Sequence, residues 1–463
     1  MSGFTSRPRS KKSGYMKMRE NLKIRETRIQ YSPFATTFDI PKKDELSSAE
    51  ILKIFAKTKI DYSWSFSDCT RKDTAYITHG YHRYPAKFIP QLARRLIKEY
   101  TNIGDIVVDP FMGSGTTVVE AIMSERLGVG VDINPVAYLI SKAKTTPIKF
   151  DKLEAEFDSL ILNIEKTKKS KIPQNERIDY WFPEEIKEKL AIIFSNINEI
   201  KNQEIKIFFL CGFSNILKNC SIWLQKSNKP TRDYEKVLPE PLDIFKRQIK
   251  FMLKRNAEFY AKIPVNNNSI VKCQDARKLP VDDGQASLIV TSPPYVTSYE
   301  YADLHQLTAL WLEYTDNLAE FRKKFIGTAH HHKKHLKIDS ELGQICVAKL
   351  KEKDNKKSEE VAMYFGEMRE CFIEMHRALK VGGKACIVIG DTSFCGVEVL
   401  SAEIFAEQMQ NIGFEIYNII KREIPSKNLP STRDPKTGQF TSSANHNKIY
   451  AYPVEYIVVM EKV

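Results

Sequence analysis

Apolar and polar positions alternate along this chain with the periods of helices and strands from about residue 80 onward. Apolar residues at helical spacing predict helices over 90–100, 116–126 and 135–144. Short apolar runs predict strands over 105–109 and 128–133. Strands and helices that alternate in this way are typical of a doubly wound, mostly parallel sheet, so we expect an α/β fold.

Two charged stretches interrupt the pattern. Residues 146–266 are rich in Lys and Glu and show helical periodicity, which predicts a large, mainly helical insertion. Residues from about 313 to 357 are predicted to form an irregular loop region. The remaining predicted elements are strands at 269–274, 286–290, 384–390, 415–420 and 455–461, and helices at 184–200, 205–217, 359–380 and 400–413.

These boundaries divide the chain into four parts. They are a basic N-terminal arm and lead-in (1–75), a first half of the sheet domain (76–145), the helical insertion (146–266), and a second half of the sheet domain (267–463).

The charge of the chain allows two interpretations. The formal net charge is +13, and a basic surface attracts polyanions such as nucleic acids. A Lys-rich proteome explains the same charge equally well. Basic residues between Arg7 and Arg28 form an arm that we expect to contact phosphates.

The sequence lacks the signals of a membrane or secreted protein. No apolar run reaches roughly eighteen residues, and no apolar signal core follows the N-terminus. The eight Cys are scattered without a CxxC pair, which predicts a reduced, cytoplasmic chain without structural zinc. The cluster of His330, His331, His332 and His335 has no carboxylate or Cys at ligand spacing, so we interpret it as a solvated basic loop rather than a metal site.

The first loop with candidate chemistry, DPFMGSGTT over 109–117, lies between a predicted strand and helix. Its glycines allow close backbone approach to a ligand, and the following helix presents unpaired N–H groups. A P-loop would need Gly-Lys-Ser/Thr and a dinucleotide site GxGxxG, whereas this loop has only GxG. An S-adenosylmethionine site needs a GxG turn and an acid ending the next strand, where Asp132 stands. A tight turn without a ligand is the alternative.

The second loop, Thr291-Ser292-Pro293-Pro294-Tyr295, directly follows a predicted strand. Successive prolines fix the backbone and lack N–H donors, so their carbonyls remain acceptors on a rigid bend. Such an acceptor beside a Ser hydroxyl suits a target that is an amine donor, and the aromatic ring can stack on a base. A Pro-rich turn that only ends the strand is the alternative, which the Gly-rich loop in the same sheet disfavours.

Together the two loops resemble those of the amino-group DNA methyltransferases of restriction-modification systems. Phe111, Gly113 and Gly115 match the family's FxGxG cofactor motif, and residues 292–295 match its [S/D/N]PP[Y/F/W] catalytic motif. Residues 84–90, YPAKFIP, are similar to its N-terminal cofactor motif. The resemblance implies a Rossmann-like S-adenosylmethionine-dependent methyltransferase fold with a mostly parallel seven-stranded sheet, S-adenosylmethionine as the cofactor and no metal.

The resemblance also implies a role for each matching residue. The GxG turn wraps the methionine part of the cofactor, Asp132 accepts hydrogen bonds from the ribose, and Asp275 receives the adenine amine. Ser292 and the Pro293 carbonyl hold the target amine, and Tyr295 stacks against the base. The expected catalytic residues are Ser292, Pro293, Pro294 and Tyr295, and the expected cofactor-binding residues are Tyr84, Pro85, Lys87, Asp109, Phe111, Gly113, Ser114, Gly115, Thr116, Asp132 and Asp275.

The choice of target base depends on Ser292, because adenine-N6 members more often carry Asp or Asn there. We therefore expect site-specific methylation of cytosine N4 in double-stranded DNA, within a restriction-modification system. A cognate restriction endonuclease is a candidate partner by analogy. An adenine-N6 DNA methyltransferase, an RNA base-amine methyltransferase and a non-catalytic DNA-binding protein on this fold remain alternatives.

The chain departs from the family pattern in two respects. Its cofactor motif precedes its catalytic motif, whereas many N4-cytosine relatives have the reverse order. More than a hundred residues also separate Asp132 from Asp275. Three segments are therefore candidates for target recognition: the insertion, Glu313–Asn355 and Lys421–Lys448.

Overall fold

The computed structural model describes residues 45–85, 87–227, 229–263, 269–296, 301–328, 337–424, 432–433, 445–446, 449–450 and 454–463. All of them belong to the larger of the two compact units into which the chain divides, Ile40–Val463. Three predicted features lie wholly or mostly outside the described residues: the basic arm between Arg7 and Arg28, the histidine cluster at 330–335, and the Lys421–Lys448 loop.

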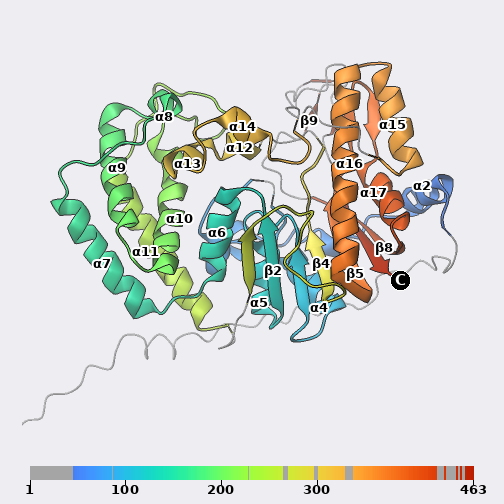
Figure 1. Cartoon of the computed structure of the whole chain (residues 1–463), viewed down its shortest axis with the longest axis horizontal. Helices are drawn as coiled ribbons and strands as arrows, with labels where there is room; N and C mark the ends of the chain where they lie inside the picture. The colour runs from blue at the N-terminus through green and yellow to red at the C-terminus, as the bar shows by residue number, and fades with distance from the viewer. Residues whose placement is uncertain are drawn as a thin grey trace, which may run out of the picture. The chain divides into compact units, whose positions relative to one another are not determined.

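Seven strands form one sheet in the order β3-β2-β1-β4-β5-β11-β8 (Figure 1). The strands from β3 to β5 are parallel to their neighbours, whereas β11 is antiparallel to both β5 and β8. This arrangement confirms the predicted doubly wound, mostly parallel sheet. Its strands are β1 (Ile106–Asp109), β2 (Leu127–Asp132), β3 (Ile270–Cys273), β4 (Ala286–Thr291), β5 (Leu379–Ile389), β8 (Phe414–Glu423) and β11 (Val454–Lys462).

Helices cover both faces of the sheet, which explains why its central strands are continuous apolar runs. On one face, Leu96 of α4 packs with Leu288 of β4. On the other, Phe372 of α16 packs with Ile289 of the same strand. The principal helices of the sheet domain are α2 (Ser48–Lys57), α4 (Pro90–Tyr100), α5 (Thr116–Met123), α6 (Pro135–Thr145), α16 (Asn355–Ala378) and α17 (Ser401–Gln410).

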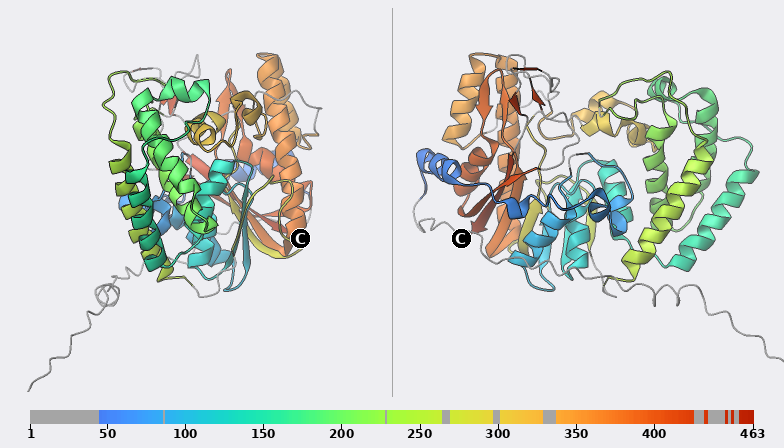
Figure 2. Two further views of the ribbon diagram at one scale, coloured as in Figure 1. Left: turned by 60° about the vertical axis from the view of Figure 1, so that its left-hand side comes forward. Right: turned by 180° about the vertical axis from the view of Figure 1, so that it is seen from behind.

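The insertion folds into helices that gather beside the sheet domain (Figure 2). Its apolar core includes Trp181, Phe208 and Phe245, and it is continuous with Trp311 in the segment that follows β4. The predicted helical insertion is therefore confirmed. Its helices are α7 (Phe150–Lys166), α8 (Glu176–Trp181), α9 (Glu184–Asn198), α10 (Gln203–Cys220) and α11 (Pro241–Tyr260).

Short elements complete the described part of the chain. They are η1 (Tyr62–Trp64), α3 (Arg71–Thr74), η2 (Ile77–Gly80), α12 (Tyr301–Leu304), α13 (Gln306–Trp311), α14 (Leu318–Arg322), α15 (Glu341–Lys351), and the strand pairs β6 (Thr392–Phe394) with β7 (Val397–Val399) and β9 (Thr432–Arg433) with β10 (Ile449–Tyr450). Within the described ranges, no helix has the length and apolarity that crossing a bilayer requires.

Two predictions about local structure were wrong. The described parts of the stretch 313–357 are largely helical, because they contain α14, α15 and the start of α16. The Ser340 side chain caps α15, and Cys346 and Leu350 of this helix are buried. The predicted helix 359–380 instead begins at Asn355 and ends at Ala378, and the glycines after it lie within β5.

Candidate active site

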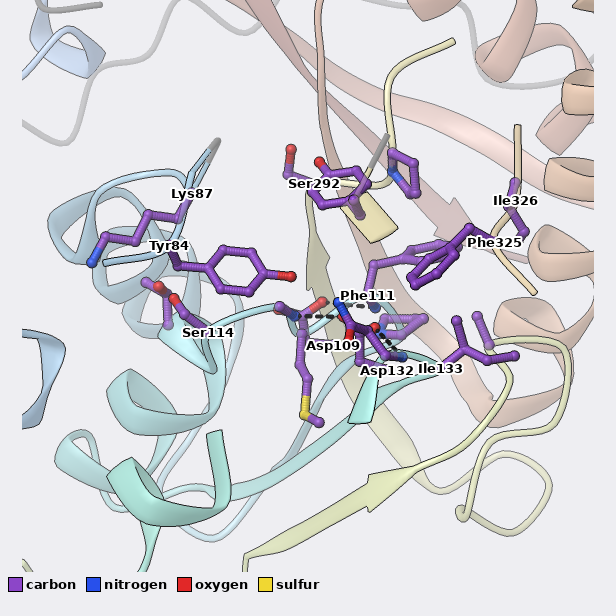
Figure 3. Close-up of a pocket in the computed structure, with 18 of the residues that line it drawn as sticks. Tyr84, Lys87, Asp109, Phe111, Ser114, Asp132, Ile133, Ser292, Phe325 and Ile326 are labelled. Atoms are coloured by element: carbon purple, nitrogen blue, oxygen red, sulfur yellow. Dashed lines mark hydrogen bonds between the residues drawn. The ribbon is translucent and has the colours of Figure 1, made fainter. Parts of the chain in front are cut away.

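One pocket lies at the carboxyl ends of the central strands, where doubly wound sheets bind their ligands. Figure 3 shows Asp109 and Asp132 at its base, Ser292 across from them, and Tyr84 and Phe325 on opposite sides. Its empty space is about 830 Å³, including open solvent at the mouth. The predicted site residues that line it are Tyr84, Lys87, Asp109, Phe111, Gly113, Ser114, Thr116, Asp132, Asp275, Ser292 and Pro294.

Four predicted site residues are not among those that line the pocket: Pro85, Gly115, Pro293 and Tyr295. Each is adjacent in the chain to a residue that does line it. Residues from both predicted loops and from the 84–90 segment therefore meet at one pocket.

The glycine loop requires glycine at two positions because of its backbone conformation. Gly113 has φ +47° and Gly115 has φ +74°, a region that residues with a side chain rarely adopt. A Cβ at Gly113 would lie 3.1 Å from Cε1 of Tyr84, and a Cβ at Gly115 would lie 2.8 Å from Oγ of Ser141. The loop thus keeps its backbone exposed toward the pocket and packed closely behind it.

Asp132 ends β2 and holds the glycine loop in place. Its Oδ2 accepts a hydrogen bond from the Gly113 N–H at 2.9 Å, and its Oδ1 accepts one from the Asn134 N–H at 2.9 Å. Burial raises the pKa of this carboxyl group to about 6. Each carboxylate oxygen keeps a further lone pair, so Asp132 can also accept hydrogen bonds from a ligand in the pocket.

Asp109 connects the strand that carries the glycine loop with the strand that carries the proline loop. Its Oδ1 accepts hydrogen bonds from the Thr291 hydroxyl at 2.6 Å and from the Phe111 N–H at 3.1 Å. Burial raises the pKa of Asp109 to about 6, although these donors oppose the shift. A second bond, from the Thr117 hydroxyl to the Val290 carbonyl at 3.1 Å, joins α5 to β4.

The proline loop is anchored from behind by hydroxyl groups. The Tyr364 hydroxyl donates to the Pro294 carbonyl at 2.7 Å, and the Tyr295 hydroxyl donates to Oε2 of Glu455 at 3.2 Å. Glu455 in turn pairs with the buried guanidinium of Arg422. Among the described residues, no donor contacts the carbonyl of Pro293, which stays available as an acceptor.

The 84–90 segment contributes an aromatic ring and a cation. The Tyr84 ring packs on His305 with 4.8 Å between ring centres. The Lys87 ammonium donates to the His79 carbonyl at 3.2 Å, and burial lowers the pKa of Lys87 to about 8. With its proton on Nε2, His305 accepts a hydrogen bond from the Asn134 amide at 2.8 Å, which links this segment to the second residue after β2.

Asp275 differs in its setting from the other predicted acids. It lies two residues after the end of β3 rather than at the end of the strand. Its Oδ2 accepts from Nη2 of Arg277 at 2.6 Å, and its Oδ1 accepts from the Arg277 N–H and Nε. Asp275 therefore lines the pocket, but its carboxylate already forms an ion pair with Arg277.

Sequence reasoning missed one wall of the pocket. Tyr301 of α12 and the residues after α14 line it, and all of them follow the proline loop in the chain. Ile133 had a readable signal, since it directly follows the acid that ends β2. The wall after α14 had none, because it lies inside a stretch dominated by charge. The lining residues that were missed are Phe88, Pro110, Met112, Ile133, Asn134, Ala276, Tyr301, Lys324, Phe325 and Ile326.

The described residues offer no obvious metal centre. Within them, no group of three or more His, Cys, Asp or Glu is arranged to hold a metal ion. All eight Cys are described, and each is a free thiol. The cluster of His330–His332 and His335 lies outside the described residues, so its interpretation as a solvated loop stays a prediction.

Comparison with known proteins adds a family match to this geometry. The N6_N4_Mtase family model, described as DNA methylase, matches residues 13–143 and 286–463. The chain is 29% identical over 401 residues to the Type II methyltransferase M.MvaI of Kocuria varians, covering 78% of this chain and 87% of that protein. It is 24% identical over 414 residues to the Type II methyltransferase M.BsoBI of Geobacillus stearothermophilus, covering 74% and 81%.

Solved structures are more distant. A protein described as a SAM-dependent methyltransferase from Methanosarcina mazei aligns with 80% of this chain and 97% of its own, at 11% identity and a TM-score of 0.28. Since this score is low, the fold assignment depends on the strand order given above. The family match leaves out 144–285, which contains the whole helical insertion.

Proposed function

Because the chain belongs to the N6/N4 family of DNA methylases, we propose that it transfers a methyl group from S-adenosylmethionine to the N4 amine of cytosine in duplex DNA. One observation carries the proposal: Ser292 of the proline loop lines the same pocket as Gly113 and Asp132 of the cofactor loop. The loops are held in register by the hydrogen bond between Thr291 and Asp109.

The pocket fits the cofactor that the family implies. Gly113 lines the pocket without a side chain, so the turn offers bare backbone to a ligand there. The Ser114 hydroxyl is buried in the pocket wall without a hydrogen-bond partner among the described residues. The Gly113–Gly115 turn and Ser114 would hold the methionine end, and Asp132 would accept the ribose hydroxyls. S-adenosylmethionine supplies an electrophilic methyl group bound to a sulfonium.

The proline loop gives the target amine two acceptors. An exocyclic amine is a weak nucleophile because its lone pair is delocalised into the ring. The Ser292 hydroxyl and the Pro293 carbonyl accept its two N–H bonds, which directs the lone pair toward the cofactor side of the pocket. The loop is fixed by prolines and by the Tyr364 bond, so it orients the amine at little further entropic cost.

The target base must leave the duplex to reach this loop. Its amine is buried in the stacked helix, and enzymes that modify such atoms flip the nucleotide out. Tyr295 supplies the stacking face in our account. Its hydroxyl is anchored to Glu455, so its ring is held in one orientation before the base arrives.

The remaining parts of the proposal rest on the sequence and on relatives. The choice of cytosine over adenine depends on Ser292 in the position where adenine-N6 members more often carry Asp or Asn. Relatives named as Type II methyltransferases support a role in a restriction-modification system, with a cognate endonuclease as partner. A cytoplasmic location follows from that role.

Incubation of the protein with methyl-tritiated S-adenosylmethionine and plasmid DNA tests the proposal. We expect label in the DNA with the wild type, strong loss of label with Ser292→Ala, and no loss with Ser195→Ala in α9. Cofactor binding by wild type without transfer to any DNA would contradict the proposal and favour a non-catalytic DNA-binding protein.

A further inference from the structure

In the insertion, two exposed tyrosine rings pack against one arginine, and none of the three residues lines the pocket. The Arg232 guanidinium carbon lies 4.1 Å from the ring centre of Tyr180 and 4.5 Å from that of Tyr234. The two tyrosines are 40% and 71% exposed. We call these three residues the tyrosine–arginine stack. Exposed aromatic rings held against a cation are typical of a surface that contacts a ligand.

The stack is built on a buried support. Trp181, next to Tyr180, stacks on Trp223 with ring centres 4.9 Å apart and planes 20° from parallel. Arg232 forms a β-bridge with Trp223, and the Ile222 N–H donates to the Trp181 carbonyl at 3.0 Å. The exposed side chains therefore project from backbone that buried rings and hydrogen bonds hold in place, and little conformational entropy is lost when they bind.

The charge around the stack favours an anionic partner. Among the described residues, the Arg232 guanidinium forms no ion pair, and only its Nε is fully buried, so the two outer nitrogens remain accessible. The segments 166–182 and 222–237, which carry the stack, contain nine Lys or Arg and four Asp or Glu. One of these acids, Asp179, is paired with Lys187 at 2.5 Å. The ammonium of Lys236 donates inward to the carbonyls of Lys218, Ser221 and Trp223, so eight of the nine cations remain to face the four acids.

A buried glutamine connects the stack to the catalytic side of the sheet. Oε1 of Gln306 accepts hydrogen bonds from Nη2 of Arg177 at 3.2 Å and from Nε1 of Trp181 at 3.0 Å. Gln306 begins α13, eleven residues after Tyr295. Helix α8 contacts α13, and Figure 1 shows these two helices next to each other in the part of the molecule that the insertion forms.

We propose that the tyrosine–arginine stack is a contact surface for duplex DNA beside the target base. This inference rests on the proposed function and assigns part of target binding to the insertion. A planar guanidinium with unpaired N–H groups can bind a phosphate or a guanine edge in bidentate fashion. The tyrosines restrict the rotation of Arg232 and present hydroxyls to the backbone of the nucleic acid.

Fluorescence anisotropy with a labelled 30-base-pair duplex of mixed sequence tests this surface in the full-length protein. For Arg232→Ala and, separately, Tyr234→Ala, we expect a roughly tenfold higher dissociation constant. For Arg232→Ala, the slope of log affinity against log salt should also become less negative by about 0.9 for each phosphate that the variant no longer neutralises. S-adenosylmethionine affinity, measured by calorimetry, should be unchanged in both variants.

Tyr417→Ala is the matched control. Tyr417 is 44% exposed and lies 4.3 Å from the Lys384 ammonium, but it packs on Tyr100 at the C-terminal end of α4, before β1 begins. This control should bind the duplex as the wild type does. Wild-type affinity and salt slope in both stack variants would overturn the inference, as would equal weakening in the control.

The two proposals fail in distinguishable ways. If the wild type binds the duplex but transfers no methyl group to plasmid DNA, the proposed function fails and the binding assay still reports on the stack. If the wild type methylates plasmid DNA and both stack variants bind and methylate equally well, only the assignment of the stack is wrong.

Discussion

The hydroxyl of Thr291 donates a hydrogen bond to Oδ1 of Asp109 over 2.6 Å, with both side chains buried. These residues end the neighbouring parallel strands β4 and β1, and each is followed directly by one of the two functional loops. The bond therefore fixes the distance between the glycine loop, which we propose holds the cofactor, and the proline loop, which we propose holds the target amine. Methyl transfer in our account requires that distance to be held within a fraction of an ångström.

Replacing Thr291 by Val removes this bond and keeps the shape of the side chain. The Asp109 carboxylate then loses a buried donor, which costs roughly 1.5–3 kcal/mol in the free energy of unfolding. We expect kcat for methyl transfer to fall about tenfold or more, because the loops lose their register. Urea denaturation and single-turnover methylation measure the two effects. Thr291→Ser retains the hydroxyl, so its free energy of unfolding and its kcat should be close to those of the wild type. An unchanged kcat in Thr291→Val would contradict the proposed role of the Thr291–Asp109 bond in methyl transfer.

Asp132 and Tyr295 are expected to affect different steps. Asp132→Ala removes the acceptor for the ribose, so cofactor affinity should fall about tenfold to a hundredfold. Tyr295→Ala removes the stacking face for the flipped base, so transfer should fall while cofactor affinity stays within about twofold. Calorimetry with S-adenosylmethionine and initial rates on plasmid DNA separate the two. Equal loss of cofactor affinity in both variants would contradict this division of roles.

Cofactor affinity is expected to depend on pH through Asp132. Burial raises its pKa above the ordinary value to about 6, and the ionised form is the better acceptor for hydroxyls. Affinity should thus be full above about pH 7 and lost as pH falls through 6, with roughly tenfold weaker binding one unit below the pKa. Asp109, also with a pKa of about 6, titrates in the same window.

Asp132→Asn distinguishes the two carboxyl groups. Its affinity is expected to be lower and nearly independent of pH between about pH 5 and pH 8, because the titrating group is gone. A pH profile in this variant that matches the wild type would assign the dependence to Asp109 instead.

The free energy of unfolding of the wild type without cofactor follows the opposite trend. The stability that comes from the raised pKa is present at low pH and lost as pH rises through about 6.

Replacing Phe325 by Ala tests whether the pocket wall that the sequence did not predict contributes to cofactor binding. It lines the pocket with Ile133 and Ile326 and contributes a large aromatic ring to that wall. Phe325→Ala should weaken S-adenosylmethionine binding about tenfold or more through lost burial. Phe245→Ala, in helix α11 of the insertion, is buried but does not line the pocket and serves as a control for general destabilisation. Equal cofactor affinity in the wild type and Phe325→Ala would place the ligand elsewhere in the pocket.

The parts of the fold that could be predicted are those set by local pattern. The apolar run at 286–290 predicts strand β4, and the amphipathic repeat at 90–100 predicts helix α4. The position of each element in the sheet domain became known only from the structure. Helix α2 carried a readable signal that was overlooked, since Ser47 and Glu50 form a capping box at its start. Helix α15 was also missed, although Leu342, Cys346 and Leu350 recur in it at helical spacing.

The parts of the site that could be predicted are those whose residues are constrained individually. Gly113 and Gly115 are required by positive φ and close packing, and the prolines of the second loop are required by its rigidity. Phe325 and Tyr301 could not be predicted, because their place in the pocket depends on how the segment after the proline loop packs against the rest of the protein. The partnership of Asp275 with Arg277 was equally hidden.

Nucleoside mass spectrometry of plasmid DNA incubated with the purified protein identifies the methylated base. We expect N4-methylcytosine in wild-type reactions and its loss with Ser292→Ala. N6-methyladenine as the product would contradict the choice of base that Ser292 suggested, and the absence of any methylated base would contradict the proposed activity itself.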